Sequence, residues 1–155
     1  MQLRRRFGIL TLVFVLLGPP AAAYEELAAL DLSAYAGQVV YLDFWASWCQ
    51  PCRASFPYMD RLQADHGKQG LVVIAVNVDT DRRLAARFLA ETPAGFRIAF
   101  DPSGTLAEQW RLEGMPTTVL IGRDGKTRFR QNGFRKADEA KLETRIAELL
   151  DEETP

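Results

Sequence analysis

Two hydrophobic periodicities follow one another along the chain, and they predict strands and helices in turn. The apolar runs "VVYLDFWA" at residues 39–46 and "LVVIAVNVD" at residues 71–79 are typical of strands buried on both faces of a parallel sheet. In chain order, the predicted elements are helix 25–35, strand 39–46, helix 50–66, strand 71–79, helix 80–91 capped by Thr80 or Asp81, strand 96–101, helix 103–110 capped by Ser103, a hairpin over 117–133 turning at Asp124 and Gly125, and helix 136–150. We therefore expect an α/β fold with a central mixed sheet, parallel in the middle and antiparallel at one edge, flanked by helices.

The first residues have the layout of a secretory leader. Three arginines at residues 4–6 precede an apolar run over residues 7–17, which two prolines and three alanines follow. The run is 11 residues long, whereas a helix needs about 20 to span a bilayer. We expect residues 1–23 to be a signal peptide cleaved after Ala23, or an N-terminal anchor if it is retained. Residues 24–155 would then form one domain in the periplasm or another extracytoplasmic space.

Charge and cysteine count exclude two classes of protein. The formal charge of -1 becomes -4 without the three leader arginines, which is not the basic surface of a nucleic-acid binder. Cys49 and Cys52 are the only cysteines, too few for the disulfide scaffold of a small secreted protein. We therefore expect the two thiols to be used chemically.

The Cys-x-x-Cys spacing fits a metal site, a haem attachment site, a structural disulfide or a redox pair. A structural zinc site needs two further ligands, and the chain offers no other cysteine and one histidine, His66. Covalent haem attachment requires a histidine directly after the second cysteine, where this chain has Arg53. A disulfide that closes so short a loop restricts the unfolded chain little, so a purely structural bridge explains the pair poorly. We predict redox catalysis, with no metal and no cofactor.

The predicted elements place the pair where a buried strand ends and a helix begins. Cys49 then meets the positive end of the helix dipole and free backbone N–H groups, both of which favour a thiolate. Cys52 lies one turn later on the same side and can attack a mixed disulfide formed at Cys49. The sequence thus predicts Cys49 as the nucleophile and Cys52 as the resolving thiol.

Asp43 interrupts an otherwise apolar strand six residues before Cys49. Burial would raise the pKa of its carboxyl toward a value that suits proton exchange with Cys52. The alternative is an aspartate with a purely structural role, or a charge at the edge of the strand. We favour proton transfer.

A second motif, "GMPTT" at residues 114–118, puts Pro116 directly before an apolar strand. A proline there is awkward unless it holds a special turn, so a cis bond between Met115 and Pro116 is one interpretation and an ordinary trans turn is the other.

Taken together, "DFWASWCQPCR", "GMPTT" and "IGRDGK" resemble the thioredoxin superfamily, and specifically the secreted TlpA/ResA-type thiol:disulfide oxidoreductases. The resemblance covers residues 27–150. It implies a thioredoxin-like fold in which an extra helix and strand between Val78 and Asp101 form the insertion that separates TlpA-type proteins from plain thioredoxin.

The resemblance also assigns roles to residues around the cysteines. It implies a redox-active Cys49–Cys52 disulfide and a cis-proline at Pro116. Trp48 and Met115 would line the docking groove, where backbone groups around Met115 pair with the client polypeptide as an added strand.

Two departures from the family pattern concern proton transfer. Many TlpA/ResA-type proteins carry a glutamate three residues after the second cysteine, where this chain has Ser55. Thioredoxin pairs its buried aspartate, which Asp43 matches, with a lysine at the position of Ala75. We expect Asp43 to lack a cationic partner.

The residues between the cysteines bear on the direction of electron flow. The strongly oxidising members of this superfamily have Pro-His between the cysteines, whereas this chain has Gln50 and Pro51. The absence of a histidine favours a reductant. The resemblance suggests a membrane thiol-reductase of the CcdA/DsbD kind as electron donor, and apocytochrome c, copper-site cysteines or other thiols as client proteins. Three alternatives stay open: a Cu(I)-binding metallochaperone-like protein, a disulfide-forming oxidant, and a redox-inactive interaction module, which the intact cysteines disfavour.

Overall fold

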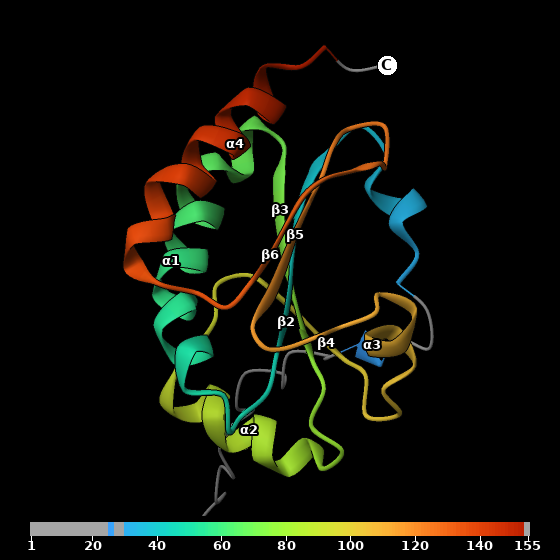
Figure 1. The fold of residues 1–155 in the computed structure, drawn as a ribbon, viewed down its shortest axis with the longest axis vertical. Helices are drawn as coiled ribbons and strands as arrows, with labels where there is room; N and C mark the ends of the chain where they lie inside the picture. Colours follow the sequence, from blue (N-terminus) through green and yellow to red (C-terminus); the bar gives the residue numbers. More distant parts are fainter. Residues whose placement is uncertain (1–24, 27–29, 154–155) are drawn as a thin grey trace, which may run out of the picture.

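A single mixed sheet organises the part of the chain that the computed structural model describes, residues 25–26 and 30–153 (Figure 1). Within these residues the strand order is β1-β4-β3-β2-β5-β6. The strands are β1 (Glu25–Glu26), β2 (Val39–Trp45), β3 (Leu71–Asn77), β4 (Arg97–Phe100), β5 (Thr117–Ile121) and β6 (Thr127–Asn132). Strands β1 to β4 are mutually parallel where they pair, whereas β5 and β6 run antiparallel to their neighbours.

Helices cover the two faces of the sheet unequally. The helical segments are η1 (Leu32–Tyr35), α1 (Gln50–His66), η2 (Gly67–Gln69), α2 (Arg82–Glu91), α3 (Thr105–Gln109), η3 (Lys136–Asp138) and α4 (Glu139–Asp151). The long helices α1 and α4 lie side by side on one face, on the left in Figure 1. The short segments η1 and α3 lie on the other face, and α2 lies at the foot of the sheet beside the start of α1.

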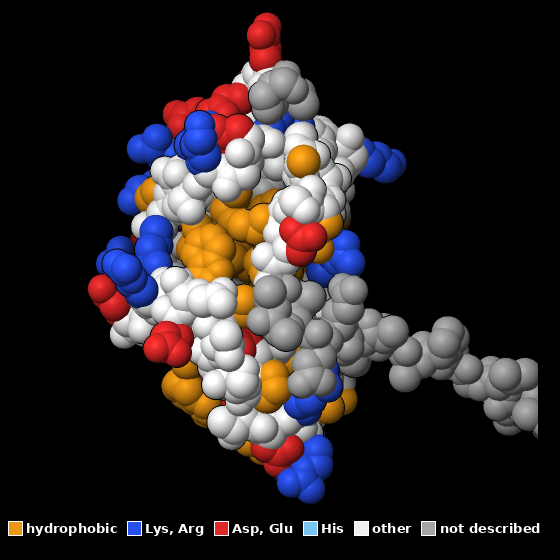
Figure 2. Space-filling model, turned by 90° about the vertical axis from the view of Figure 1, so that its right-hand side faces the viewer, with side chains coloured by type: hydrophobic (Ala, Val, Ile, Leu, Met, Phe, Trp, Pro, Cys, Tyr) orange, Lys and Arg blue, Asp and Glu red, His pale blue; other side chains and the backbone are white. Residues whose placement is uncertain are grey.

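Strand β2 is the centre of the core because β3 and β5 flank it, and all 7 of its residues are buried. Its side chains alternate between the two faces, as in any strand. The face under α1 and α4 carries an aromatic cluster, in which the Trp45 ring lies 4.9 Å from that of Phe56 and 4.7 Å from that of Phe88. The opposite face is mainly aliphatic, and Figure 2 shows hydrophobic side chains gathered in a hollow on it.

Most of the predicted elements are confirmed, and so is the thioredoxin-like fold. The two apolar runs form β2 and β3, α1 spans the predicted residues, and Asp81 caps α2 by accepting a hydrogen bond from Arg83 N at 3.0 Å. The hairpin of β5 and β6 turns at Gly125, whose φ of +74° suits a residue without a side chain.

The predicted insertion corresponds to α2 and β4, and both of its ends are fastened to Asn77. The Asn77 side chain donates to Asp79 Oδ2 at 2.8 Å where the insertion leaves β3. The Asn77 carbonyl accepts from Asp101 N, also at 2.8 Å, where the insertion returns.

Two predictions about local structure are wrong. Residues 25–35 do not form one helix: Glu25 and Glu26 pair with β4 as a strand, and the only helical turn described there is η1, which Asp31 caps by accepting from Ser33 N at 2.9 Å. The backbone groups of residues 25–26 pair with the edge of β4. If these residues formed a helix, the N–H and C=O groups on that edge of β4 would lose these partners. Residues 27–29 lie outside the described chain.

Ser103 is also not the N-cap of α3. That position belongs to Gly104, and Asp101 Oδ2 accepts the hydrogen bond from Ala107 N at 2.8 Å. The carboxylate of Asp101, two residues before Ser103, therefore accepts the hydrogen bond predicted for the serine hydroxyl.

The predicted leader at residues 1–23 lies outside the described residues and stays a prediction, as does the division of the chain at residue 24. Among the residues that are described, none of the helices has the length and apolar character needed to cross a bilayer.

Candidate active site

Cys49 and Cys52 lie at the carboxyl end of the central strand, joined by a disulfide with an S–S distance of 2.04 Å. Cys49 is the N-cap of α1, and its sulfur accepts a hydrogen bond from Cys52 N at 3.3 Å. Pro51 fits the first turn because the N–H that it lacks would have no partner in the helix. The helix start thus supplies an N–H group and a partial positive charge to the sulfur of Cys49, which is the setting that stabilises a thiolate.

The two sulfurs differ in access. Cys49 is 4% exposed and Cys52 is 0% exposed, and both residues pack in the core cluster under α1. Cys49 is therefore the more accessible of the two residues, which is compatible with the predicted roles of Cys49 as nucleophile and Cys52 as resolving thiol.

A buried polar network, not predicted from the sequence, holds the loop before the cysteines. Asp79 accepts hydrogen bonds from Ser47 N at 2.9 Å, from Ser47 Oγ at 3.1 Å and from Asn77 Nδ2 at 2.8 Å. It thereby ties the loop after β2 to the loop after β3. The sequence did contain a signal for this network: Ser47 follows β2 and Asp79 follows β3. The carboxyl ends of neighbouring parallel strands lie at the same edge of a sheet, so polar residues at these two positions can meet.

Asp43 is buried, as predicted, and faces the same side of β2 as the aromatic cluster. Thr118 Oγ1 donates to its Oδ1 at 2.7 Å, while Oδ2 is buried with no hydrogen-bond partner among the described residues. Burial raises the pKa of the Asp43 carboxyl to about 7, and the Thr118 hydrogen bond opposes this rise. Ala75 pairs with Asp43 on β3, at the position where thioredoxin has its lysine, so that strand offers no cation.

The bond between Met115 and Pro116 is cis, which confirms the first interpretation of the "GMPTT" motif. Thr117 pairs with Phe44 in antiparallel register, so Pro116 lies at the end of the sheet where β2 runs into the cysteine loop. The Pro116 carbonyl accepts from Gly133 N at 2.7 Å and is not free for a client. Met115 is half-buried against the aromatic cluster, and its backbone has no hydrogen-bond partner within the described residues.

The two tryptophans of the motif have different environments. Trp45 is fully buried between Phe56 and Phe88. Trp48 is 70% exposed and directly precedes Cys49. This position is compatible with the docking role predicted for Trp48, which stays a prediction.

Among the described residues, no three His, Cys, Asp or Glu side chains are grouped so that they could hold a metal ion.

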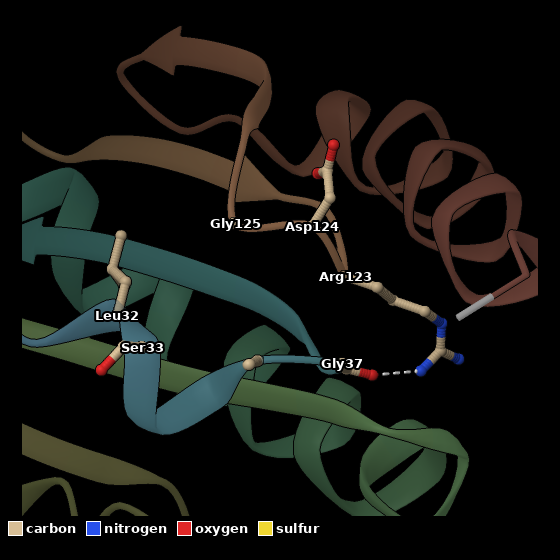
Figure 3. A pocket seen from close by; sticks show the side chains of 7 residues that line it. Leu32, Ser33, Gly37, Arg123, Asp124 and Gly125 are labelled. Carbon is tan, nitrogen blue, oxygen red and sulfur yellow. Dashed lines mark hydrogen bonds between the residues drawn. The ribbon is translucent and has the colours of Figure 1, made fainter. Parts of the chain in front are cut away.

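A pocket of about 660 Å³ opens between η1 and the hairpin turn at Asp124 and Gly125, where Arg123 donates to the Gly37 carbonyl at 2.7 Å (Figure 3). Gly37 precedes β2, so this pocket is at the opposite end of the strand from the cysteines.

The arrangement of strand, cysteine loop, helix and cis-proline agrees with the comparison of the sequence with known families. The family described as Redoxin matches residues 19–146, which is most of the chain. The chain belongs to the Redoxin family.

Individual relatives are more specific. The chain is 33% identical to the thiol-disulfide oxidoreductase ResA of Oceanobacillus iheyensis over 99 residues, covering 64% of this chain and 52% of the relative. ResA of Bacillus subtilis is 32% identical over 97 residues, covering 63% and 54%. The chain thus spans about half the length of these curated relatives.

A solved structure described as a putative thiol:disulfide interchange protein DsbE, from Chlorobium tepidum, is 50% identical to the chain. The two superpose with a TM-score of 0.75 over 77% of this chain and 84% of that one. These similarities confirm the resemblance to TlpA/ResA-type proteins of the thioredoxin superfamily, whose named members are thiol-disulfide oxidoreductases and whose cysteine pair this chain has.

Proposed function

We propose that the protein is an extracytoplasmic thiol:disulfide oxidoreductase that reduces disulfides in client proteins through Cys49 and Cys52. The observation that carries this proposal is the disulfide itself, with Cys49 at the N-cap of α1 and Cys52 buried one turn later. The names of the ResA and DsbE relatives support the same chemistry.

The reaction begins with the reduced protein. The Cys49 thiolate attacks one sulfur of the client disulfide, a mixed disulfide forms, and the other client sulfur leaves as a thiolate. Cys52 then loses its proton and attacks the sulfur of Cys49, which releases the second client thiolate. The client gains two electrons, and the protein ends with the Cys49–Cys52 bond that the structure contains.

The proton of Cys52 needs an acceptor because its sulfur is fully buried. Asp43 supplies one: its pKa of about 7 lets the carboxylate accept a proton near neutral pH and release it afterwards. Ser55 cannot replace a glutamate in this step, since its hydroxyl donates to the Cys52 carbonyl at 3.0 Å.

The direction of electron flow rests on the sequence between the cysteines. Gln50 and Pro51 add no histidine that would stabilise the thiolate and make the pair strongly oxidising. A reductant in an oxidising compartment must be reduced again, so the electron donor is a membrane thiol-reductase of the CcdA/DsbD kind. Clients are proteins whose cysteines must be kept reduced, such as apocytochrome c. The leader-like residues 1–23 support a location outside the cytoplasm.

The deciding experiment is the redox equilibrium of residues 24–155 against defined thiol buffers, followed by tryptophan fluorescence. A potential near or below about -230 mV supports the reductase, whereas a value near about -120 mV contradicts it and favours a disulfide-forming oxidant.

Insulin reduction provides the functional assay, with a matched pair of cysteine variants. Cys49→Ser should abolish turnover, and Cys52→Ser should accumulate a mixed disulfide with the client that can be isolated without reductant. Turnover that survives in Cys49→Ser would contradict the assignment of the nucleophile.

A further inference from the structure

Three buried polar side chains form a chain of hydroxyl and carboxyl groups in the core between β2 and β5. Asp43 on β2 pairs in register with Thr118 on β5, and Thr118 Oγ1 lies 2.7 Å from Asp43 Oδ1. Tyr41, two residues before Asp43 on the same face of β2, places its hydroxyl 3.4 Å from the same Thr118 oxygen. The exposed fractions of Tyr41, Asp43 and Thr118 are 0%, 0% and 1%, so water does not compete for these contacts.

The direction of the hydrogen bonds follows from the chemistry of the groups. An ionised carboxylate only accepts, so Thr118 must donate its single hydroxyl proton to Asp43 Oδ1. Its lone pairs are then free to accept from the Tyr41 hydroxyl. Oδ1 of the ionised carboxylate is therefore occupied, whereas Oδ2 has no partner in the described chain.

We propose that Thr118 is a positioning residue for proton transfer: by holding Oδ1, its hydroxyl makes Oδ2 the oxygen of Asp43 that exchanges a proton with Cys52. The inference rests on the proposed function. In the resolving step, the S–H bond of Cys52 breaks and an O–H bond forms at Oδ2. The electron pair left on Cys52 forms the bond to Cys49 as the client sulfur departs with the electrons of the mixed disulfide.

The other groups around Asp43 do not replace this hydrogen bond. Strand β3 pairs Ala75 with Asp43, and on α1 the ring of Tyr58 packs on that of Tyr41 at 6.3 Å. Cys52 lies in the same core cluster as Tyr41, Tyr58 and Ala75. The charges of Glu139 and Glu143 on α4 and of Arg61 on α1 act on Tyr58. Thr118 is the one hydrogen-bond donor to Asp43 among the described residues.

Removal of the hydroxyl should therefore change how Asp43 titrates. A donor to the charged form lowers the pKa of an acid, so Thr118→Val should raise the pKa of Asp43 by about one unit. At pH 7, the ionised fraction would fall from about half to about a tenth, and the resolving step would slow about 5-fold. At pH 9 or above, the two rates should agree within about twofold, because both carboxyls are then ionised.

The test measures the rate of mixed-disulfide resolution by stopped flow between pH 5 and 10 for the wild type and three variants. Thr118→Val is the deletion of the hydroxyl, Thr118→Ser is the variant that keeps it, and Tyr41→Phe removes only the outer hydroxyl. The carboxyl of Asp43 is titrated in parallel by carbon NMR. We expect the midpoint to rise in Thr118→Val, to stay with the wild type in Thr118→Ser, and to move less in Tyr41→Phe than in Thr118→Val.

The outcomes separate this inference from the proposed function. An active wild type with an unshifted rate profile in Thr118→Val overturns the role of Thr118. An equal shift in Thr118→Ser also overturns it, since the hydroxyl would then not be the cause. A wild type that leaves insulin disulfides intact at every pH overturns the proposed function, while the NMR titration still decides whether Thr118 sets the pKa of Asp43.

Discussion

The two faces of strand β2 carry different kinds of side chain. Toward α1 and α4 the strand presents Tyr41, Asp43 and Trp45, and toward η1 and α3 it presents aliphatic and aromatic side chains that have no polar atoms. The residues on this second face are Val40, Leu42 and Phe44. Both faces are equally buried, so burial alone does not distinguish the carboxyl proposed to transfer a proton from a side chain that only packs. The two faces differ in their neighbours: the face with Tyr41, Asp43 and Trp45 lies under α1, the helix that begins at the cysteines.

Leu42 and Asp43 make this contrast within two adjacent residues. Both side chains are 0% exposed. Leu42 packs against other apolar side chains, whereas Asp43 has a carboxyl oxygen without a hydrogen-bond partner among the described residues. Substitutions at the two positions should therefore move the free energy of unfolding in opposite directions.

The largest effect on stability is expected on the packing face. Leu42→Ala removes three carbon atoms from a fully buried site and should lower the free energy of unfolding by about 2–5 kcal/mol, measured by urea denaturation. The matched control is Leu84→Ala on α2, where the side chain is 40% exposed and the cost should be within about 0.5 kcal/mol. Disulfide exchange per folded molecule should be unchanged in both variants, and a slower exchange in Leu42→Ala would break the division between the faces.

Asp43→Asn should instead stabilise the protein, by an amount that depends on pH. The folded-state pKa is raised from 3.8 to about 7, so the folded protein binds more protons than the unfolded chain between these values and loses stability as the pH rises. The gain from Asp43→Asn should be absent near pH 4 and reach at most about 4 kcal/mol above pH 7. The same variant should slow disulfide reduction, and unchanged kinetics from neutral to alkaline pH would remove Asp43 from the mechanism.

An exposed aspartate provides the control with the opposite sign. Ion pairing and hydrogen bonding with Arg128 hold the pKa of Asp124 at about 2. Asp124 therefore contributes stability that is present above its unfolded pKa and is lost as the pH falls toward 2. Asp124→Asn should give no gain at pH 8, and a gain there equal to that of Asp43→Asn would show that burial is not the cause.

The smallest effect on stability is expected at the exposed tryptophan. Trp48→Ala should change the free energy of unfolding by less than about 0.5 kcal/mol, because the side chain is 70% exposed. If Trp48 contacts clients, the variant should raise KM for insulin while kcat stays within about twofold. Trp48→Phe retains an aromatic surface and should restore most of the affinity. Equal KM values for the wild type and Trp48→Ala would remove Trp48 from the docking groove.

Long, strongly patterned segments were predictable because local sequence decides them. The apolar runs of β2 and β3, the helix that begins at Cys49 and the Asp124-Gly125 turn appear where the sequence puts them. Asp43 was noticeable as the one charge in a buried strand. The failed helix at residues 25–35 was decided by the edge of β4, about 70 residues away in the chain.

The polar contacts around the candidate site are less visible in the sequence because they join distant residues. Ser47 meets Asp79 across 32 positions, and Asp43 meets Thr118 across 75. From the local sequence, Thr118 is indistinguishable from any β-branched residue that favours a strand. Only the antiparallel register of β2 and β5 places its hydroxyl on the carboxyl.

The attachment of the insertion to Asn77 has a consequence for how such proteins diversify. Asn77 closes the base of the inserted segment, because its side chain donates to Asp79 and its carbonyl accepts from Asp101 N. Helix α2 also packs inward, since the ring of Phe88 lies 4.7 Å from that of Trp45 and 4.8 Å from that of Phe56. The outer surface of α2 can therefore change in charge or composition without disturbing the cysteine loop. A change at Phe88, in contrast, would alter the packing of the core cluster that contains Cys52. We expect sequence variation in this segment to fall on its outer surface and to spare Phe88.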